Sequence, residues 1–207
     1  MMTDRRDTVL FDLDGTLIDP KRRLYTLFAE LTHCRLTYEA YWERKDAGYN
    51  QKRMLEEVGY DAALIPGFAD LWHQEIERQD LLDLDRVFED VTETIHGLAS
   101  KGIRMYIVTN RLSLDGVGYE MDRFGLGGSF SGILSTKQQC TKAEAVRRAG
   151  VDLAGAVFVG DSREDMETAG ALGIPGILLT RGTDRKNGTV TADHYIDNLG
   201  ELRGILF

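Results

Sequence analysis

The sequence predicts an α/β fold, in which a parallel sheet is covered by helices on both faces and interrupted near its start by a helical insert. After residue 88, short apolar and β-branched runs alternate with helical stretches over short connections. This alternation is typical of parallel strands joined by crossover helices. Between about residues 20 and 85 the strand pattern stops, and apolar residues recur every three or four positions. A chain of 207 residues is long enough for both parts.

The first strand is expected over residues 8–13, where an apolar, β-branched run precedes acidic residues. The stretch that follows has few β-branched runs, and glycine and proline residues divide it into about four helices. We place this insert at residues 18–88. Residues 1–17 and 89–207 then form a discontinuous α/β core.

The elements of the core after the insert are expected to alternate to the end of the chain. The predicted helices cover 90–100, a segment ending near 124, 141–149, 163–172 and a short terminal segment. The predicted strands cover 103–108, 130–134, 156–159, 174–179 and 195–196.

The composition is that of a soluble globular protein, with 43% hydrophobic and 29% charged residues and no low-complexity tract. The net charge of −9 argues against a nucleic-acid partner, because binding to a phosphate backbone requires clustered lysine and arginine. A small phosphorylated ligand stays compatible with this charge, since a bound divalent cation inverts the local field.

Two features bear on the cellular compartment. Cys34 and Cys140 lie far apart and form no zinc-binding spacing, so reduced thiols are expected. The first residues lack the apolar segment of a signal peptide, and no apolar stretch approaches membrane-spanning length. We therefore expect a cytoplasmic protein without a membrane partner. The sequence leaves open whether it is a monomer or a homodimer.

A pair of carboxylates at the end of the first strand is the strongest indication of function. Asp12 and Asp14 are two residues apart, so both side chains lie on one side of an extended chain. Gly15 then lets the backbone leave the strand. Two carboxylates this close are both ionised only where a cation joins them. A metal-bound nucleophile beside a proton-donating carboxylic acid is one interpretation, and an acidic surface turn is the other.

Further polar residues follow later strands. Thr109 and Asn110 come directly after one apolar run, and Asp161 after another. In parallel sheets, ligands bind beyond the carboxyl ends of the strands, where these side chains are expected to meet. A third carboxylate beside Asp12 and Asp14 would make a hard oxygen site suited to Mg²⁺ and substrate phosphate.

Two residues after Asp161 have both a structural and a functional interpretation. Ser162 and Asp165 stand where the next helix is expected to begin. Serine is a favoured N-cap residue, and an acid in the first turn is stabilised by the helix dipole. A capping role is therefore as well supported as a functional one.

Four segments in order, DLDGTL, VTN, a lysine region and GDSREDM, resemble the motifs of the haloacid dehalogenase superfamily of phosphohydrolases. The likeness covers essentially the whole chain and includes residues 160–182 and 192–202. It is closest to the phosphoglycolate-phosphatase-like branch, which carries a helical cap after the first motif. The resemblance implies a Rossmann-like core, with 18–88 as the cap, and a Mg²⁺-dependent phosphatase acting on a small phosphorylated metabolite.

The resemblance also implies roles for the acidic residues. Asp12 would attack phosphorus and carry an aspartyl-phosphate, and Asp14 would protonate the leaving oxygen and then activate water. Mg²⁺ would be bound by the Asp12 carboxylate, the Asp14 backbone carbonyl and Asp161. Asp165 would be an occasional metal ligand, or would contact a residue that binds the metal.

Phosphate binding is implied for five residues, namely Gly15, Thr16, Thr109, Asn110 and Lys142. The lysine is the least secure of these, because many relatives have Lys-Pro and this chain offers Lys137 and Lys142 without proline. We prefer Lys142, since Thr-Lys-Ala-Glu is typical of a helix start after a strand. Its charge would stabilise the transferring phosphoryl group.

Two other activities are compatible with these motifs. A phosphoglucomutase-like phosphotransferase often has valine where this chain has Thr16, which favours the phosphatase. A non-catalytic binding or regulatory protein would usually lack the nucleophile or a metal ligand, and Asp12, Asp14 and Asp161 are all present. The identity of the phosphomonoester stays open.

Overall fold

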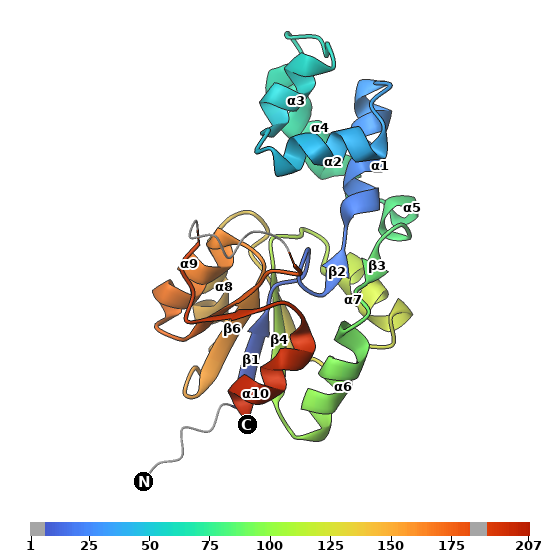
Figure 1. The fold of residues 1–207 in the computed structure, drawn as a ribbon. Helices are drawn as coiled ribbons and strands as arrows, with labels where there is room; N and C mark the ends of the chain where they lie inside the picture. The colour runs from blue at the N-terminus through green and yellow to red at the C-terminus, as the bar shows by residue number, and fades with distance from the viewer. Residues whose placement is uncertain (1–6, 183–189) are drawn as a thin grey trace. The chain divides into compact units, whose positions relative to one another are not determined.

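The computed structural model describes residues 7–182 and 190–207 (Figure 1). The chain forms two compact units, one of Met1–Asp19 with Val87–Phe207 and one of Pro20–Arg86. The first unit is an α/β structure and the second is helical. In the described ranges, no helix combines the length and apolar character needed to cross a membrane.

The α/β unit contains a six-stranded sheet whose paired neighbours all run parallel. In spatial order its strands are β5 (Gly132–Ser135), β4 (Arg104–Thr109), β1 (Thr8–Phe11), β6 (Ala156–Gly160), β7 (Gly176–Leu179) and β8 (His194–Ile196). The predicted α/β fold class is therefore confirmed. β1 and β4 are central strands, so residues that follow them lie in the middle of the sheet edge.

Helices cover both faces of this sheet. They are α6 (Val91–Ser100), α7 (Leu114–Arg123), α8 (Lys142–Arg148), α9 (Arg163–Leu172) and α10 (Leu202–Leu206), with a 3-10 turn at Leu199–Glu201. Alternate residues of β1 supply the two cores: Val9 and Phe11 pack with α6, α7 and α10, and Leu10 packs with α8 and α9. β1 is thus buried on both faces, as a central parallel strand requires.

The edge strand β5 differs slightly from its prediction. The sequence predicts a strand over 130–134, whereas β5 covers Gly132–Ser135. Phe130 packs against the core beside Phe11 before the strand begins. Pairing with β4 starts only at Gly132, which lies opposite Tyr106. The hydrophobic run therefore begins two residues before β5, and the Ser131 amide already donates to the Met105 carbonyl at 2.7 Å.

The helical unit contains one short helix more than the predicted four. Its helices are α1 (Lys21–Thr32), α2 (Tyr38–Asp46), α3 (Gln51–Glu57), α4 (Phe68–Glu75) and α5 (Gln79–Leu82), with a 3-10 turn at Ile65–Gly67. The unit has its own aromatic core, in which Phe28, Tyr41 and Phe68 are fully buried. A small second sheet consists of β2 (Ile18–Asp19) and β3 (Arg86–Val87).

A candidate active site at the carboxyl ends of β1, β4 and β6

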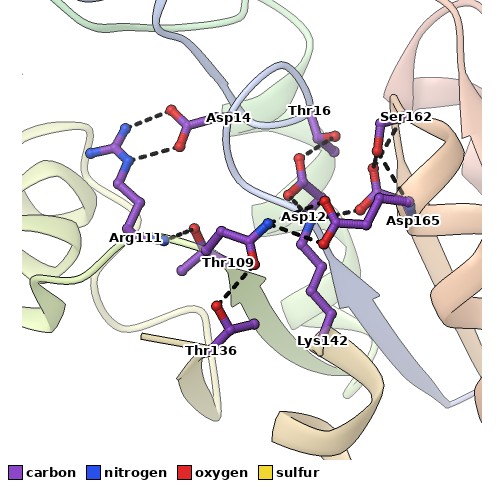
Figure 2. Close-up of polar contacts among 11 residues, drawn as sticks. Asp12, Asp14, Thr16, Thr109, Arg111, Thr136, Lys142, Ser162 and Asp165 are labelled. Carbon is purple, nitrogen blue, oxygen red and sulfur yellow. Dashed lines mark hydrogen bonds and ion pairs between the residues drawn. The ribbon is translucent and has the colours of Figure 1, made fainter. Parts of the chain in front are cut away.

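Asp12 lies directly beyond β1 and is 6% exposed. Its backbone amide donates to the carbonyl of Val159 on β6 at 2.9 Å, which extends the ladder by one residue. The Thr16 hydroxyl donates to Asp12 Oδ2 at 3.1 Å. The turn between them brings this hydroxyl back to the carboxylate that precedes it. Asp12 is therefore a buried carboxylate with one oxygen already oriented (Figure 2).

Gly15 is required by this turn for two reasons. Its φ is +91°, a region that residues with a side chain rarely adopt. A Cβ at this position would also lie 2.6 Å from Asp161 Oδ2, closer than any real contact. The absence of a side chain thus lets the turn after β1 approach the carboxylate at the end of β6.

Lys142 reaches the same place from the first residue of α8. Its Nζ contacts Asp12 Oδ1 at 2.6 Å and Asp165 Oδ1 at 2.7 Å (Figure 2). The helix starts here because Thr141 and Glu144 form a capping box. The side chain is 4% exposed, whereas Lys137 is an exposed residue. The structure thus brings Lys142 to Asp12 and leaves Lys137 on the surface.

Asp165 both caps α9 and faces Lys142. Its Oδ2 accepts from the Ser162 amide at 3.0 Å and from the Ser162 hydroxyl at 2.6 Å, which completes the capping box of α9. Its Oδ1 faces Lys142 at the same time, and the residue is completely buried. The helix cap therefore fixes the direction of a site carboxylate.

A group of three carboxylates forms the acidic part of the site. Oxygens of Asp12, Asp161 and Asp165 lie within 4.8 Å of one another. Burial, and after it the nearby Asp165 carboxylate, raises the pKa of Asp12 well above its ordinary value of 3.8, although Lys142 acts in the opposite direction. Burial also opposes the charge of Lys142, but Asp12 and Asp165 outweigh it and raise the lysine pKa.

These residues fit a divalent cation. Carboxylate oxygens are the hard ligands that Mg²⁺ prefers, and Mg²⁺ is usually held by only one or two of them together with water and phosphate. Three carboxylates lie together here and Lys142 brings one positive charge to them, so the ionised cluster carries excess negative charge. A second cation would relieve this excess.

The residues at the end of β4, where Thr109 is the last strand residue, are hydrogen-bonded to neighbouring segments. Thr109 is 1% exposed, and its hydroxyl accepts from the Arg111 amide at 3.2 Å. The Asn110 side chain donates to Glu164 on α9 at 3.1 and 3.2 Å and accepts from the Thr136 hydroxyl at 2.9 Å. The segment beyond β4 is thereby connected both to α9 and to the loop before α8.

Asp14 has a partner that the sequence analysis did not identify. The Arg111 guanidinium donates to both of its oxygens, from Nε at 2.8 Å and from Nη2 at 2.7 Å. Arg111 in turn contacts Glu120 of α7, which is completely buried, at 2.5 Å. Two signals could have revealed this: Arg111 directly follows Asn110 at a strand end, and Glu120 stands beside Met121 on the apolar face of α7.

Comparisons with known proteins identify a matching family and structures of the same fold. The profile of the haloacid dehalogenase-like hydrolase family matches residues 9–179. A phosphoglycolate phosphatase of Pseudomonas syringae pv. tomato is 28% identical over 84% of this chain and 69% of its own length. A Geobacter sulfurreducens hydrolase of the same superfamily, subfamily IA, superposes with a TM-score of 0.70 at 18% identity, covering 97% of this chain and 96% of its own. YfnB of Bacillus subtilis, crystallised bound to magnesium, gives 0.68 at 20% identity over 98% and 99%.

Proposed function

The chain belongs to the haloacid dehalogenase-like hydrolase family and is a phosphatase, and we propose that it hydrolyses a small phosphomonoester through an aspartyl-phosphate on Asp12, with Mg²⁺ as cofactor. The observation that carries this proposal is the buried contact of Lys142 with both Asp12 and Asp165 beyond β1. The relatives named phosphoglycolate phosphatase support a small phosphorylated substrate.

Asp12 is suited to attack phosphorus because its carboxylate is fixed in place. The Thr16 hydroxyl holds one oxygen and the Lys142 ammonium contacts the other. In the first step, an Asp12 oxygen forms a bond to phosphorus while the bond to the leaving alkoxide breaks. In the second step, water attacks the same phosphorus, and the Asp12 carboxylate is released together with inorganic phosphate.

Asp14 is proposed to move the proton in both steps. It follows the nucleophile by two residues on the same loop and keeps 32% of its side chain exposed. As an acid it would donate to the leaving oxygen, and as a base it would take a proton from the attacking water. Both transfers leave Asp14 unchanged at the end of a cycle.

The negative charge on the transferring phosphoryl group would be stabilised by protein residues and by Mg²⁺. Lys142 supplies a fixed ammonium, and Gly15, Thr16, Thr109 and Asn110 lie around the ends of β1 and β4, where they would bind phosphoryl oxygens. Mg²⁺ would be held by Asp12, Asp161 and the Asp14 carbonyl, with Asp165 beside them, as the close carboxylates and the magnesium-bound YfnB structure support. When bound, it would neutralise phosphate charge and orient the substrate.

Phosphate release from a panel of small phosphomonoesters, beginning with phosphoglycolate, tests this proposal. We expect turnover with Mg²⁺ that is lost in EDTA and in Asp12→Asn. Asp152→Asn, which changes an exposed aspartate of the same unit, serves as the matched control and should keep the wild-type rate. Turnover that survives Asp12→Asn would contradict the proposed nucleophile, and turnover that survives EDTA would contradict the metal.

A further inference from the structure

Three charged residues form a connected series beside the proposed nucleophile, in which Arg111 and Glu120 are buried and Asp14 is partly exposed. Glu120 of α7 contacts Arg111 Nη1 at 2.5 Å, and Arg111 contacts Asp14 through Nε and Nη2 at 2.8 and 2.7 Å. The side chains of Arg111 and Glu120 are 4% and 0% exposed. A guanidinium that meets a carboxylate through two parallel hydrogen bonds fixes its orientation as well as its position.

Arg111 is itself held on several sides. Its amide donates to the Thr109 hydroxyl, and its carbonyl accepts from the Ser135 hydroxyl on β5. Glu120 fixes the far side of the guanidinium from the buried face of α7. The position of the guanidinium is therefore set by β4, β5 and α7 together, all of which belong to the α/β unit.

Asp14 is less constrained by its own loop. Its side chain is 32% exposed, and in Figure 2 it is directed toward Arg111 and away from the cluster of Asp12, Lys142 and Asp165. Both carboxylate oxygens are engaged by Arg111, so at least one hydrogen bond must open before the carboxyl group reaches a leaving oxygen.

We infer that Arg111, anchored by Glu120, is the positioning residue of Asp14, which sets where this carboxyl group rests and returns it to one place between turnovers. This inference rests on the proposed function, in which Asp14 exchanges protons with the leaving group and with water. Asp14 donates its proton to the leaving oxygen while the phosphoryl group is transferred to Asp12. Arg111 acts only through Asp14, so its importance should depend on how much the leaving oxygen needs a proton.

Two substrates separate this role from a general structural one. An alkyl phosphate leaves as a strongly basic alkoxide and depends on an acid, whereas p-nitrophenyl phosphate leaves as a weakly basic phenolate. The informative quantity is the ratio of kcat for the best alkyl phosphate of the panel to kcat for p-nitrophenyl phosphate. A fold that is merely loosened would lower both rates and leave this ratio unchanged.

The variants must avoid leaving a buried charge alone. Arg111→Met by itself would take the guanidinium away from the buried Glu120 carboxylate, so the main variant is Arg111→Met combined with Glu120→Leu. We expect it to lower the ratio about 10- to 100-fold, less than the roughly 10²- to 10⁴-fold of general acid catalysis as a whole, because Asp14 itself is still present. Arg111→Lys keeps the charge but not the paired geometry, and should restore part of the ratio. Arg123→Met, an exposed arginine at the end of α7, should leave it unchanged.

The Asp14→Asn background completes the test. If Arg111 acts through Asp14, the paired substitution should lower the ratio no further once Asp14 is gone. An equal loss on both substrates, a further loss in the Asp14→Asn background, or a ratio that rises would each overturn the inference. Failure of the proposed function is a different result, because the wild-type protein would then release no phosphate from either substrate or would be indifferent to Asp12→Asn.

Discussion

Each unit buries a cation against a carboxylate, but the two sites differ in charge. In the helical unit, Arg23 donates through Nε to both oxygens of Asp85 at 3.0 and 2.9 Å, and the two side chains are 3% and 0% exposed. In the α/β unit, one lysine contacts two carboxylates while a third lies within 4.8 Å. The first arrangement pairs its charges, and the second keeps negative charge in excess.

The comparison shows how a buried ion pair can be assigned to folding or to function. The Asp85 carboxylate, whose two oxygens share the Nε–H of Arg23, connects the end of the helical unit to α1, and one positive charge matches one negative charge. A carboxylate whose pKa is raised by burial and by a second carboxylate is energetically unfavourable in its ionised form. Carboxylates with a raised pKa are typical of sites that bind a cation or transfer a proton or another group.

The largest effect is expected from breaking the pair in the helical unit. Arg23→Met leaves Asp85 buried without its guanidinium partner and should lower the free energy of unfolding by about 3–5 kcal/mol. Arg23→Met with Asp85→Leu removes both charges and should recover most of that loss. Urea denaturation monitored by circular dichroism measures both. A double variant as unstable as the single one would show that the pair contributes more than charge balance.

Removing the lysine of the α/β site should lower stability, because it takes the ammonium from two buried carboxylates, and should also lower kcat of the folded protein. We expect Lys142→Ala to lower kcat about 10²- to 10³-fold, as loss of one fixed donor to a transferring group typically does. Lys137→Ala, on the exposed lysine of the preceding loop, is the matched control and should keep the wild-type rate. The opposite ranking of these two variants would mean that Lys137 is the functional residue.

Neutralising Asp12 should stabilise the protein in EDTA while it abolishes turnover. The folded protein keeps a proton on Asp12 that the unfolded chain releases near pH 4, because burial and then Asp165 raise the folded pKa. Wild-type stability therefore falls as the pH rises through the folded pKa, and Asp12→Asn lacks this contribution. Melting temperatures of both proteins from pH 4 to 8 measure the difference, and a variant less stable throughout would contradict the account.

The smallest effect is expected at Tyr41 in the aromatic core of the helical unit. Burial raises the pKa of Tyr41 to about 12, so the unfolded chain loses this proton near pH 10 while the folded protein keeps it. Stability should therefore decrease between about pH 10 and pH 12 in the wild type, and less so in Tyr41→Phe. At neutral pH the phenol is protonated in both the folded and the unfolded state, so Tyr41 titration does not change the stability there. Equal alkaline profiles for the two proteins would contradict it.

The sequence predicted which strand ends and which helix start supply the site residues, because local patterns specify these features. Asp12, Thr109 and Asp161 each follow a β-rich run, and parallel strands bring such positions to one edge. The helix start at Lys142 was readable from the Thr141–Glu144 capping box. These features depend on a few adjacent residues, which is why they could be predicted.

Pairing between distant side chains could not be predicted in the same way. Asp14 and Arg111 are 97 residues apart, and nothing local to either one specifies the other. Glu120 stands beside Met121 on the apolar side of its helix, but this local pattern does not show that Glu120 contacts Arg111. The simultaneous contacts of Asp165 with Ser162 and with Lys142 could not be predicted either, because a helix cap and a carboxylate that faces Lys142 have the same sequence signal.

The central claim is that Asp12 carries the phosphoryl group, and acid-quenched single turnover tests it most directly. The protein is mixed with its preferred phosphomonoester and Mg²⁺, quenched within a turnover, digested and analysed by mass spectrometry. We predict one phosphate increment on the peptide that contains Asp12, transient in the wild type and absent in Asp12→Asn. Phosphate release without any phosphorylated peptide, or a phosphoryl group on another residue, would contradict it.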